Sequence, residues 1–353
     1  MNINNNSADV NLVAQSEYLG RNPGGISRYC YEQTKNIAQY MPEHMKMKIT
    51  SIKHGTGPFS ILATKIMSLR FNPDSKIIHN LTEMPLIPSN KGNTILINTA
   101  HEFQRILYPE ITKTEGRMLS EIPEYLIKKS YMWDILKGDY IIATSSQTKR
   151  EAQKLGFDNK IYVVNPGVSA EFLHQPKHVS KKGEFIVGYI GAIRKRKGIK
   201  MLVDSMTYLD GEVKLKIYGI VFNRFRRDFD GIMKRAKNTE YCGVVPKSKL
   251  VRTYDSFDAF VVPSIYEGFG MGILEAQARG IPVIINGRGK LPYETSKHCF
   301  KANDAMHVSD ILQRIKDNGY NARLRKTAIS YAKKFTWKRT ADETIKVYES
   351  LVC

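Results

Sequence analysis

The sequence predicts an α/β protein with two doubly wound domains, each built around a parallel β-sheet. The chain has 353 residues, more than one compact core usually organises, so two domains are expected. Short apolar runs alternate with amphipathic stretches along the whole chain, as they do in βα units. Hydrophobic residues make up 42% and charged residues 25%, which is typical of a soluble globular protein. No run of apolar residues is long enough to predict a membrane span.

The first half of the chain predicts one domain, residues 1–170. Apolar runs predict its strands at 10–14, 48–52, 76–79, 94–99, 140–143 and 161–164. Helical periodicity predicts helices at 26–40, near 118–136 and at 146–155, the last with Ser146 as its cap. A polar stretch with Pro176, residues 171–183, is interpreted as the linker between the domains.

The second half predicts another domain, residues 171–335, followed by a final helical segment, residues 336–353. Its strands are expected at 185–190, 213–218, 241–244, 259–262 and 282–285. Its helices are expected at 199–206, 229–236, 247–256 and 272–278. Three more helical patterns close the chain, and the last of them runs from about 337 to 351.

A glycine-rich turn between a buried strand and a helix, residues 263–276, carries the clearest functional signal. Its sequence is PSIYEGFGMGILEA, with Glu267 on the turn and Glu275 eight residues later on the helix. Glycines let the backbone approach a ligand closely, and the N–H groups at a helix start favour an anion. Carboxylates on either side of that anion can accept hydrogen bonds from hydroxyl groups. Phosphate flanked by two hydroxyl-rich groups describes a nucleotide sugar; the alternative is an ordinary βα unit with solvated glutamates.

The spacing Glu267-x7-Glu275 within this sequence resembles the donor site of glycosyltransferase family 4. The resemblance implies a retaining sugar transferase of the GT-B fold, with two Rossmann-like domains facing a cleft. It implies that Glu275 binds the ribose hydroxyls and that Glu267 binds the sugar ring as a catalytic residue. The donor-binding backbone is then expected at Gly268, Phe269, Gly270, Met271 and Gly272. The first domain is expected to bind the acceptor, and the final helix to cross back onto it.

A basic turn follows the first strand of the second domain, with Arg194, Arg196 and Lys197 ahead of Gly198. A diphosphate leaving group needs cations that stabilise the charge that develops as the glycosidic bond breaks. The turn is similar to the family's basic turn, which implies that Arg196 and Lys197 lie on the diphosphate as catalytic residues. Ala192 stands where many family members have an arginine, so either Arg194 or Arg196 can be the phosphate-binding arginine. A solvated basic turn is the structural alternative.

Three further segments resemble donor or acceptor elements of the family. Gly24 and Gly25 precede the first long helix, where backbone N–H groups can meet phosphate, although such a pair is often only a turn. His101 follows a predicted strand and resembles a catalytic histidine of the family that contacts the transferred sugar, although a lone histidine is often structural. Val244 and Val245 match the strand end whose backbone meets the base.

No metal or other cofactor is expected. Asp228 and Asp230 form a D-x-D pattern, but they lie among basic residues, and we interpret them as acids at a helix N-terminus. The cations of the basic turn stand where a metal would act in the other large glycosyltransferase fold. The four cysteines are widely scattered, without the spacing of a metal site or a disulfide framework.

The net charge of +20 is unevenly distributed, with +5 in residues 1–170 and +15 in residues 171–353. An anionic donor, an anionic membrane, nucleic acid and general solubility are competing explanations. The run Arg224, Arg226 and Arg227 interleaves phenylalanine, as single-stranded nucleic-acid sites do. A solvated helix face is the commoner outcome, so nucleic acid is not favoured, while peripheral contact with an anionic membrane stays open.

The predicted function is the retaining transfer of a hexosyl group from a UDP- or GDP-sugar to a glycan, lipid-linked or protein-linked acceptor. The alternatives are a GT-B phosphorylase or epimerase, and a basic nucleic-acid- or membrane-binding protein without transferase activity. The N-terminus lacks the basic and apolar regions of a signal peptide. A cytoplasmic location is therefore expected, with attachment to the inner face of a membrane left open. The donor base, the sugar, the acceptor and the oligomeric state are not encoded in any readable pattern.

Overall fold

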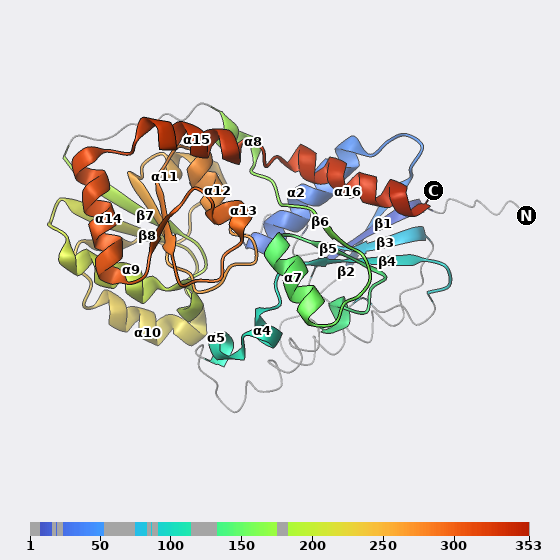
Figure 1. The fold of residues 1–353 in the computed structure, drawn as a ribbon, viewed down its shortest axis with the longest axis horizontal. Helices are drawn as coiled ribbons and strands as arrows, with labels where there is room; N and C mark the ends of the chain where they lie inside the picture. Colours follow the sequence, from blue (N-terminus) through green and yellow to red (C-terminus); the bar gives the residue numbers. More distant parts are fainter. Residues whose placement is uncertain are drawn as a thin grey trace, which may run out of the picture. The chain divides into compact units, whose positions relative to one another are not determined.

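The computed structural model describes residues 8–15, 19, 24–52, 75–82, 86, 91–113, 133–174 and 183–352. Contacts divide the chain into two compact units (Figure 1). The first unit takes in residues 1–109, 117–167 and 337–353, and the second takes in residues 110–116 and 168–336. The final helix α16 (Trp337–Val352) thus belongs to the first unit, although it follows the second in sequence.

The first unit is built on a six-stranded parallel sheet in the order β2-β1-β3-β4-β5-β6. Its strands are β1 (Ala8–Gln15), β2 (Met47–Ile52), β3 (Ser75–Asn80), β4 (Ile95–Ala100), β5 (Tyr140–Ala143) and β6 (Ile161–Val163). The central strands are almost fully buried because helices cover both faces of the sheet, as is usual for parallel sheets. The helices are α2 (Gly25–Tyr40), α4 (Gln104–Leu107), α7 (Ser146–Lys154) and α16, whereas the short helix α5 (Pro109–Lys113) belongs mostly to the second unit.

Helices α2 and α16 pack against each other and are joined to the sheet by buried polar contacts. The Gln33 amide on α2 donates to the Thr344 hydroxyl on α16 at 2.7 Å. The two ring nitrogens of His79 on β3 contact the Tyr348 hydroxyl at 2.6 Å and the Thr99 hydroxyl at 2.8 Å. These hydrogen bonds satisfy polar groups that would be costly to bury alone, and they hold α16 on the first unit.

The second unit is built on another six-stranded parallel sheet, in the order β12-β11-β10-β7-β8-β9. Its strands are β7 (Phe185–Ile190), β8 (Val213–Tyr218), β9 (Thr239–Tyr241), β10 (Ala259–Val262), β11 (Val283–Asn286) and β12 (Phe300–Ala302). The prediction of an α/β fold with two doubly wound parallel sheets is therefore confirmed.

Helices on both faces of this sheet enclose two apolar cores. One face is covered by α9 (Ile199–Ser205), α10 (Asn223–Met233) and α14 (Ala305–Asn318), which bury Leu202, Phe229 and Ile311. The other face is covered by α8 (Ala170–Leu173), α11 (Leu250–Tyr254), α12 (Met271–Ala278) and α15 (Ala322–Ala332). The remaining short elements are α13 (Tyr293–Ser296) and the 3-10 turns η2 (Lys195–Lys197), η3 (Met206–Tyr208) and η4 (Lys247–Lys249).

Two predicted elements are displaced along the chain. The helix expected at 229–236 is α10, Asn223–Met233, because Phe225 and Phe229 face the core one helical turn apart and start the helix earlier. Asp228 and Asp230 therefore lie inside a helix, and the interpretation of a helix N-terminus is wrong. The strand expected at 241–244 is β9, Thr239–Tyr241, and Gly243 beyond it has a φ of +71°, which no regular strand accommodates.

Other expectations change in detail. The cap of α7 is Ser145, whose hydroxyl accepts from the Thr148 N–H, and Ser146 is the first helical residue. The expected linker 171–183 begins inside helix α8, where Phe172 is buried; its residues 175–182 lie outside the described residues. Most of the helix expected near 118–136 also lies outside them. Strand β12 was not predicted, because three residues are too few for a periodic pattern.

Candidate functional site

The site predicted from the glycine-rich and basic turns lies at the carboxyl edge of the second sheet. The chain forms β7 first, adds β8 and β9 on one side, and then returns to place β10 on the other side. The loops after the adjacent strands β7 and β10 therefore lead in opposite directions along the sheet. Open α/β sheets bind ligands at such a point, next to the carboxyl ends of the strands. Residues 191–198 follow β7 and residues 263–270 follow β10, so strand order brings the two motifs together.

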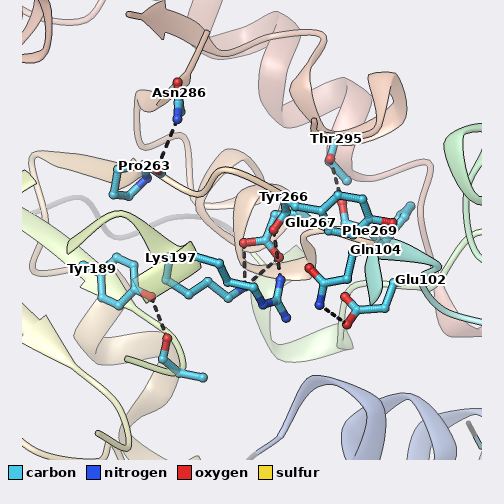
Figure 2. A network of polar contacts seen from close by, with 12 residues as sticks. Glu102, Gln104, Tyr189, Lys197, Pro263, Tyr266, Glu267, Phe269, Asn286 and Thr295 are labelled. Atoms are coloured by element: carbon cyan, nitrogen blue, oxygen red, sulfur yellow. Dashed lines mark hydrogen bonds and ion pairs between the residues drawn. The ribbon is translucent and has the colours of Figure 1, made fainter. Parts of the chain in front are cut away.

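A largely shielded ion pair joins the two motifs (Figure 2). The Lys197 ammonium donates to both carboxylate oxygens of Glu267, at 2.6 Å and 2.7 Å. The side chains are only 14% and 13% exposed, so the pair is shielded from solvent. Burial acts to raise the pKa of Glu267, but the charges of Lys197 and Arg196 outweigh it and hold that pKa below its usual range. The carboxylate is therefore ionised at neutral pH, with its charge balanced within the site.

Backbone contacts hold the same two loops in register. The Ile265 N–H donates to the Arg196 carbonyl at 2.9 Å, and the Arg196 guanidinium donates to the Tyr266 carbonyl at 3.0 Å. Gly198 has a φ of +70°, and a Cβ there would lie 2.1 Å from the Pro263 carbonyl oxygen. Only glycine permits this approach of the basic turn to the end of β10. The Arg196 side chain is buried, and its hydrogen bond to the Tyr266 carbonyl supports the Glu267 loop.

The Glu267 loop is fixed on its other side by the segment after β11. The Glu267 N–H donates to the Lys290 carbonyl at 3.0 Å, and the Lys290 N–H donates to the Ile265 carbonyl at 2.8 Å. The Thr295 hydroxyl donates to the Phe269 carbonyl at 2.8 Å (Figure 2). Hydrogen bonds on both sides leave the loop little freedom, so Glu267 is preorganised rather than mobile.

Helix α12 begins directly after this loop. Gly270 caps it with a φ of +90°, a conformation that glycine adopts at little cost, and Met271 and Gly272 form its first turn. Glu275 lies in the buried part of the helix, 2% exposed, and the Tyr254 hydroxyl donates to its Oε2 at 3.0 Å. The backbone N–H groups at the start of α12 and the carboxylates on either side form the arrangement expected for a bound anion with hydroxyl-rich neighbours.

The other basic and base-binding candidates lie on loops along the same sheet edge. The Arg194 guanidinium stacks on the Phe222 ring, 3.5 Å from its centroid. The Gly219 N–H donates to the Gly243 carbonyl at 2.8 Å, which joins the loop after β8 to the loop of Val244 and Val245. Val244 is 47% exposed at that edge, with its apolar side chain open to solvent. Arg196 thus lies against the Glu267 loop, whereas Arg194 lies against the loop after β8.

The candidates of the first unit lie at the carboxyl ends of its strands and at a helix start. Gly24 and Gly25 are exposed at the beginning of α2, and the Ser27 hydroxyl donates to the Gly24 carbonyl at 2.8 Å. His101 follows β4 and is buried, with Nε2 2.9 Å from the Leu81 carbonyl oxygen. Burial lowers the pKa of His101, so its ring is neutral, with Nε2 donating to Leu81. The Tyr29 ring packs edge-on against it at 4.8 Å.

Two tyrosines that support the site were not predicted. Tyr254 on α11 contacts Glu275, and the Tyr189 hydroxyl on β7 donates to the Ala192 carbonyl at 3.1 Å (Figure 2). Tyr189 belongs to an apolar strand and Tyr254 to an amphipathic helix, and both patterns predict only core packing. No spacing rule links them to the motifs, so only the folded sheet could identify them.

The D-x-D pattern lies on the exposed side of α10. Asp228 and Asp230 are both exposed, and Asp230 is 3.8 Å from the Arg226 guanidinium. Within the described residues, no helix is both long and apolar enough to cross a membrane.

Several proteins similar to this chain are named glycosyltransferases. The model of the family "Glycosyl transferases group 1" matches residues 171–335, which include both motifs. O-antigen chain mannosyltransferase B of Escherichia coli is 31% identical over 173 residues, 46% of this chain. D-inositol 3-phosphate glycosyltransferase of Xylanimonas cellulosilytica is 25% identical over 74% of this chain and 68% of its own. The aligned region spans only 45% of the mannosyltransferase and 60% of an uncharacterized glycosyltransferase of Methanocaldococcus jannaschii.

Solved structures extend the likeness of fold to nearly the whole chain. Sucrose-phosphate synthase from Thermosynechococcus elongatus superposes with a TM-score of 0.75 at 19% identity, over 97% of this chain and 98% of its own. Anabaena HepE, solved with UDP-glucose, superposes with a TM-score of 0.70 at 16% identity, over 97% and 99% of the two chains. The chain therefore has the two-domain α/β fold of GT-B glycosyltransferases, and its residues 171–335 match the glycosyl transferases group 1.

Proposed function

We propose that this protein is a retaining glycosyltransferase that moves a hexosyl group from a nucleotide-diphosphate sugar to a glycan-type acceptor. The observation that carries the proposal is the convergence of Lys197, Glu267 and the start of α12 at the switch point of the second sheet. A cation, a carboxylate and a row of backbone N–H groups there match the parts of a nucleotide sugar.

Each part of the donor has a matching group in the site. The diphosphate is assigned to Lys197, to an arginine of the basic turn and to the N–H groups at the start of α12. Of the two arginines, Arg196 is held against the Glu267 loop through the Tyr266 carbonyl. We therefore assign the phosphate role to Lys197 first, with Arg196 shaping the loop and Arg194 at the outer rim. The sugar hydroxyls are assigned to Glu267 and the ribose hydroxyls to Glu275.

The proposed reaction breaks the bond between the anomeric carbon and the phosphate oxygen. Lys197 and the α12 N–H groups stabilise the negative charge that develops on the departing diphosphate. The acceptor hydroxyl attacks from the same face, and its proton passes to the leaving phosphate oxygen. The new glycosidic bond then has the configuration of the old one. The ammonium of Lys197 supplies the positive charge, so we propose that the reaction needs no metal.

Relatives support the choice of substrates. One relative is named a mannosyltransferase and another an inositol 3-phosphate glycosyltransferase, and HepE was solved with UDP-glucose. We propose a UDP- or GDP-sugar as the donor and a glycan, lipid-linked or protein-linked molecule as the acceptor. The reaction is proposed to take place in the cytoplasm, where nucleotide sugars are available.

A thermal-shift screen over UDP-, GDP- and ADP-sugars tests the proposal, since a ligand that binds only the folded state raises its stability. The expected result is stabilisation by one nucleotide class, lost in Glu275→Ala. Release of nucleoside diphosphate with a matched acceptor, unchanged in excess EDTA, should follow. Product formation that depends on inorganic phosphate would indicate a phosphorylase, and interconversion of free sugar nucleotides an epimerase. No stabilisation by any nucleotide sugar would contradict the proposal.

A further inference from the structure

Helix α10 carries a dense basic surface that the proposed function does not use. Between residues 222 and 239 there are six lysines and arginines against two aspartates. Arg224, Arg226 and Arg227 are exposed, as are Lys234 and Arg235 just beyond the helix. Phe225 and Phe229 hold one side of α10 in the core, so the charged residues occupy the rest of its circumference, where Arg226 lies 3.8 Å from Asp230. We call Arg224, Arg226, Arg227, Lys234 and Arg235 the α10 basic surface.

Two exposed apolar side chains lie directly before the helix. Ile220 is 46% and Phe222 38% exposed. The Ile193 N–H donates to the Ile220 carbonyl at 2.8 Å, and the Phe222 N–H donates to the Ile193 carbonyl at 3.2 Å. These bonds hold both residues on the rim of the basic turn. An apolar edge beside a cluster of cations is the pattern that binds the boundary between lipid headgroups and acyl chains.

Nucleic acid fits the same surface less well. Proteins that bind single strands stack bases on open aromatic faces. The aromatic ring exposed here, Phe222, has the Arg194 guanidinium over one face at 3.5 Å. The aliphatic side chain of Ile220 offers no face for a base. The exposed apolar groups are suited to insertion between lipids rather than to stacking.

We propose that the α10 basic surface, with Ile220 and Phe222 at its edge, docks this protein onto an anionic membrane. The arginines attract anionic headgroups, and the two apolar side chains enter the interface. Because Phe222 contacts Arg194, docking would place the rim of the basic turn close to the headgroups. Resting on the proposed function, this position would favour an acceptor carried by a lipid.

Co-sedimentation of the full chain with phosphatidylcholine vesicles, with and without phosphatidylglycerol, tests this proposal. Binding is expected only with the anionic lipid, and it should weaken at high salt because surface charges are screened. The triple variant R224Q/R226Q/R227Q should bind roughly a hundredfold more weakly, since each basic residue near such a surface contributes about fivefold. I220S should weaken binding without changing its dependence on salt.

The control removes the same charge elsewhere on the second unit. Arg323, Lys326 and Lys333 are exposed on or next to α15, so R323Q/K326Q/K333Q has the same net charge as the first triple variant. This control should keep its vesicle binding. Equal loss in both triple variants, or no binding at low salt, would overturn the proposal. Tighter binding of single-stranded RNA than of vesicles through the same arginines would also overturn it.

A melting temperature close to that of the wild type will show that the triple variant is folded. Nucleotide-sugar stabilisation measured without vesicles separates this proposal from the function proposed above. If vesicles bind and no nucleotide sugar does, docking stands and the transferase proposal fails. The opposite result removes only the docking.

Discussion

The partly buried pair of Lys197 and Glu267 should produce a strong energetic coupling between mutations of the two residues. Lys197→Met keeps the length of the side chain but removes its charge, and it leaves the Glu267 carboxylate with 13% exposure and no ammonium beside it. Breaking a buried ion pair from one side costs about 3–5 kcal/mol. Because both side chains keep some contact with solvent, we expect a loss of about 3 kcal/mol in the free energy of unfolding. Glu267→Gln in the Lys197→Met background should recover much of that loss, because it removes the isolated charge.

The pH dependence of the same variants has a definite sign. In the wild type the pKa of Glu267 is lowered, so its stabilising effect is present above its ordinary pKa near 4.3 and is lost as pH falls through the lowered pKa. In Lys197→Met the largest source of that lowering is gone, and burial then raises the pKa. The destabilisation by Lys197→Met should therefore shrink as pH falls from 7 toward 5, because protonation neutralises the isolated carboxyl group.

Urea unfolding of the four proteins in the cycle, followed by far-UV circular dichroism, is the appropriate assay. The two tryptophans, Trp133 and Trp337, both belong to the first unit, so fluorescence would not report on this site. The reasoning is refuted if Glu267→Gln costs the same in the Lys197→Met background as in the wild type. Additive losses would mean that the pair contributes no coupling.

Four further predictions follow from individual contacts. Gly198→Ala should cost at least about 2 kcal/mol in unfolding free energy, because of its φ of +70° and the 2.1 Å approach to Pro263; Gly211→Ala, with open space around it, is the control and should change little. Lys197→Ala should lower turnover about a hundredfold, as loss of a group facing developing charge does; a change below about threefold would transfer the role to the arginines. Glu275→Ala should weaken nucleotide binding, measured by calorimetry, by about 1.5–3 kcal/mol. Tyr254→Phe removes only the 3.0 Å hydrogen bond to the Glu275 carboxylate and should weaken binding less. Unchanged affinity in Glu275→Ala would disprove the ribose assignment. Burial lowers the pKa of His79 to about 3, so on acidification His79 is protonated in the unfolded state before it is protonated in the folded state. The free energy of unfolding should therefore fall by about 2 kcal/mol between pH 7 and pH 5. His79→Gln should remove this part of the pH dependence, and an unchanged pH dependence in that variant would contradict the prediction.

Local sequence patterns were enough to predict the buried strands and most helices. Strands β7, β8 and β10 were predicted at their observed bounds, because continuous or alternating apolar runs have no other stable environment in an α/β protein. Elements at the sheet edge were less predictable. Strand β9 and helix α10 were displaced by a few residues, since short, half-exposed segments carry weak periodicity and tertiary packing sets their ends.

The candidate site likewise has a part that the sequence predicted and a part that only the folded chain shows. Glycine spacing and residue type were enough to locate the two motifs, because close backbone approach and helix starts have local requirements. The pairing of Lys197 with Glu267, 70 residues apart, was decided by the strand order that places β10 beside β7. Tyr254 reaches Glu275, and Thr295 reaches the Glu267 loop, only because separate βα units end at one edge of the sheet. Local sequence thus specifies which chemical groups are present, and the order of the strands specifies which of them meet.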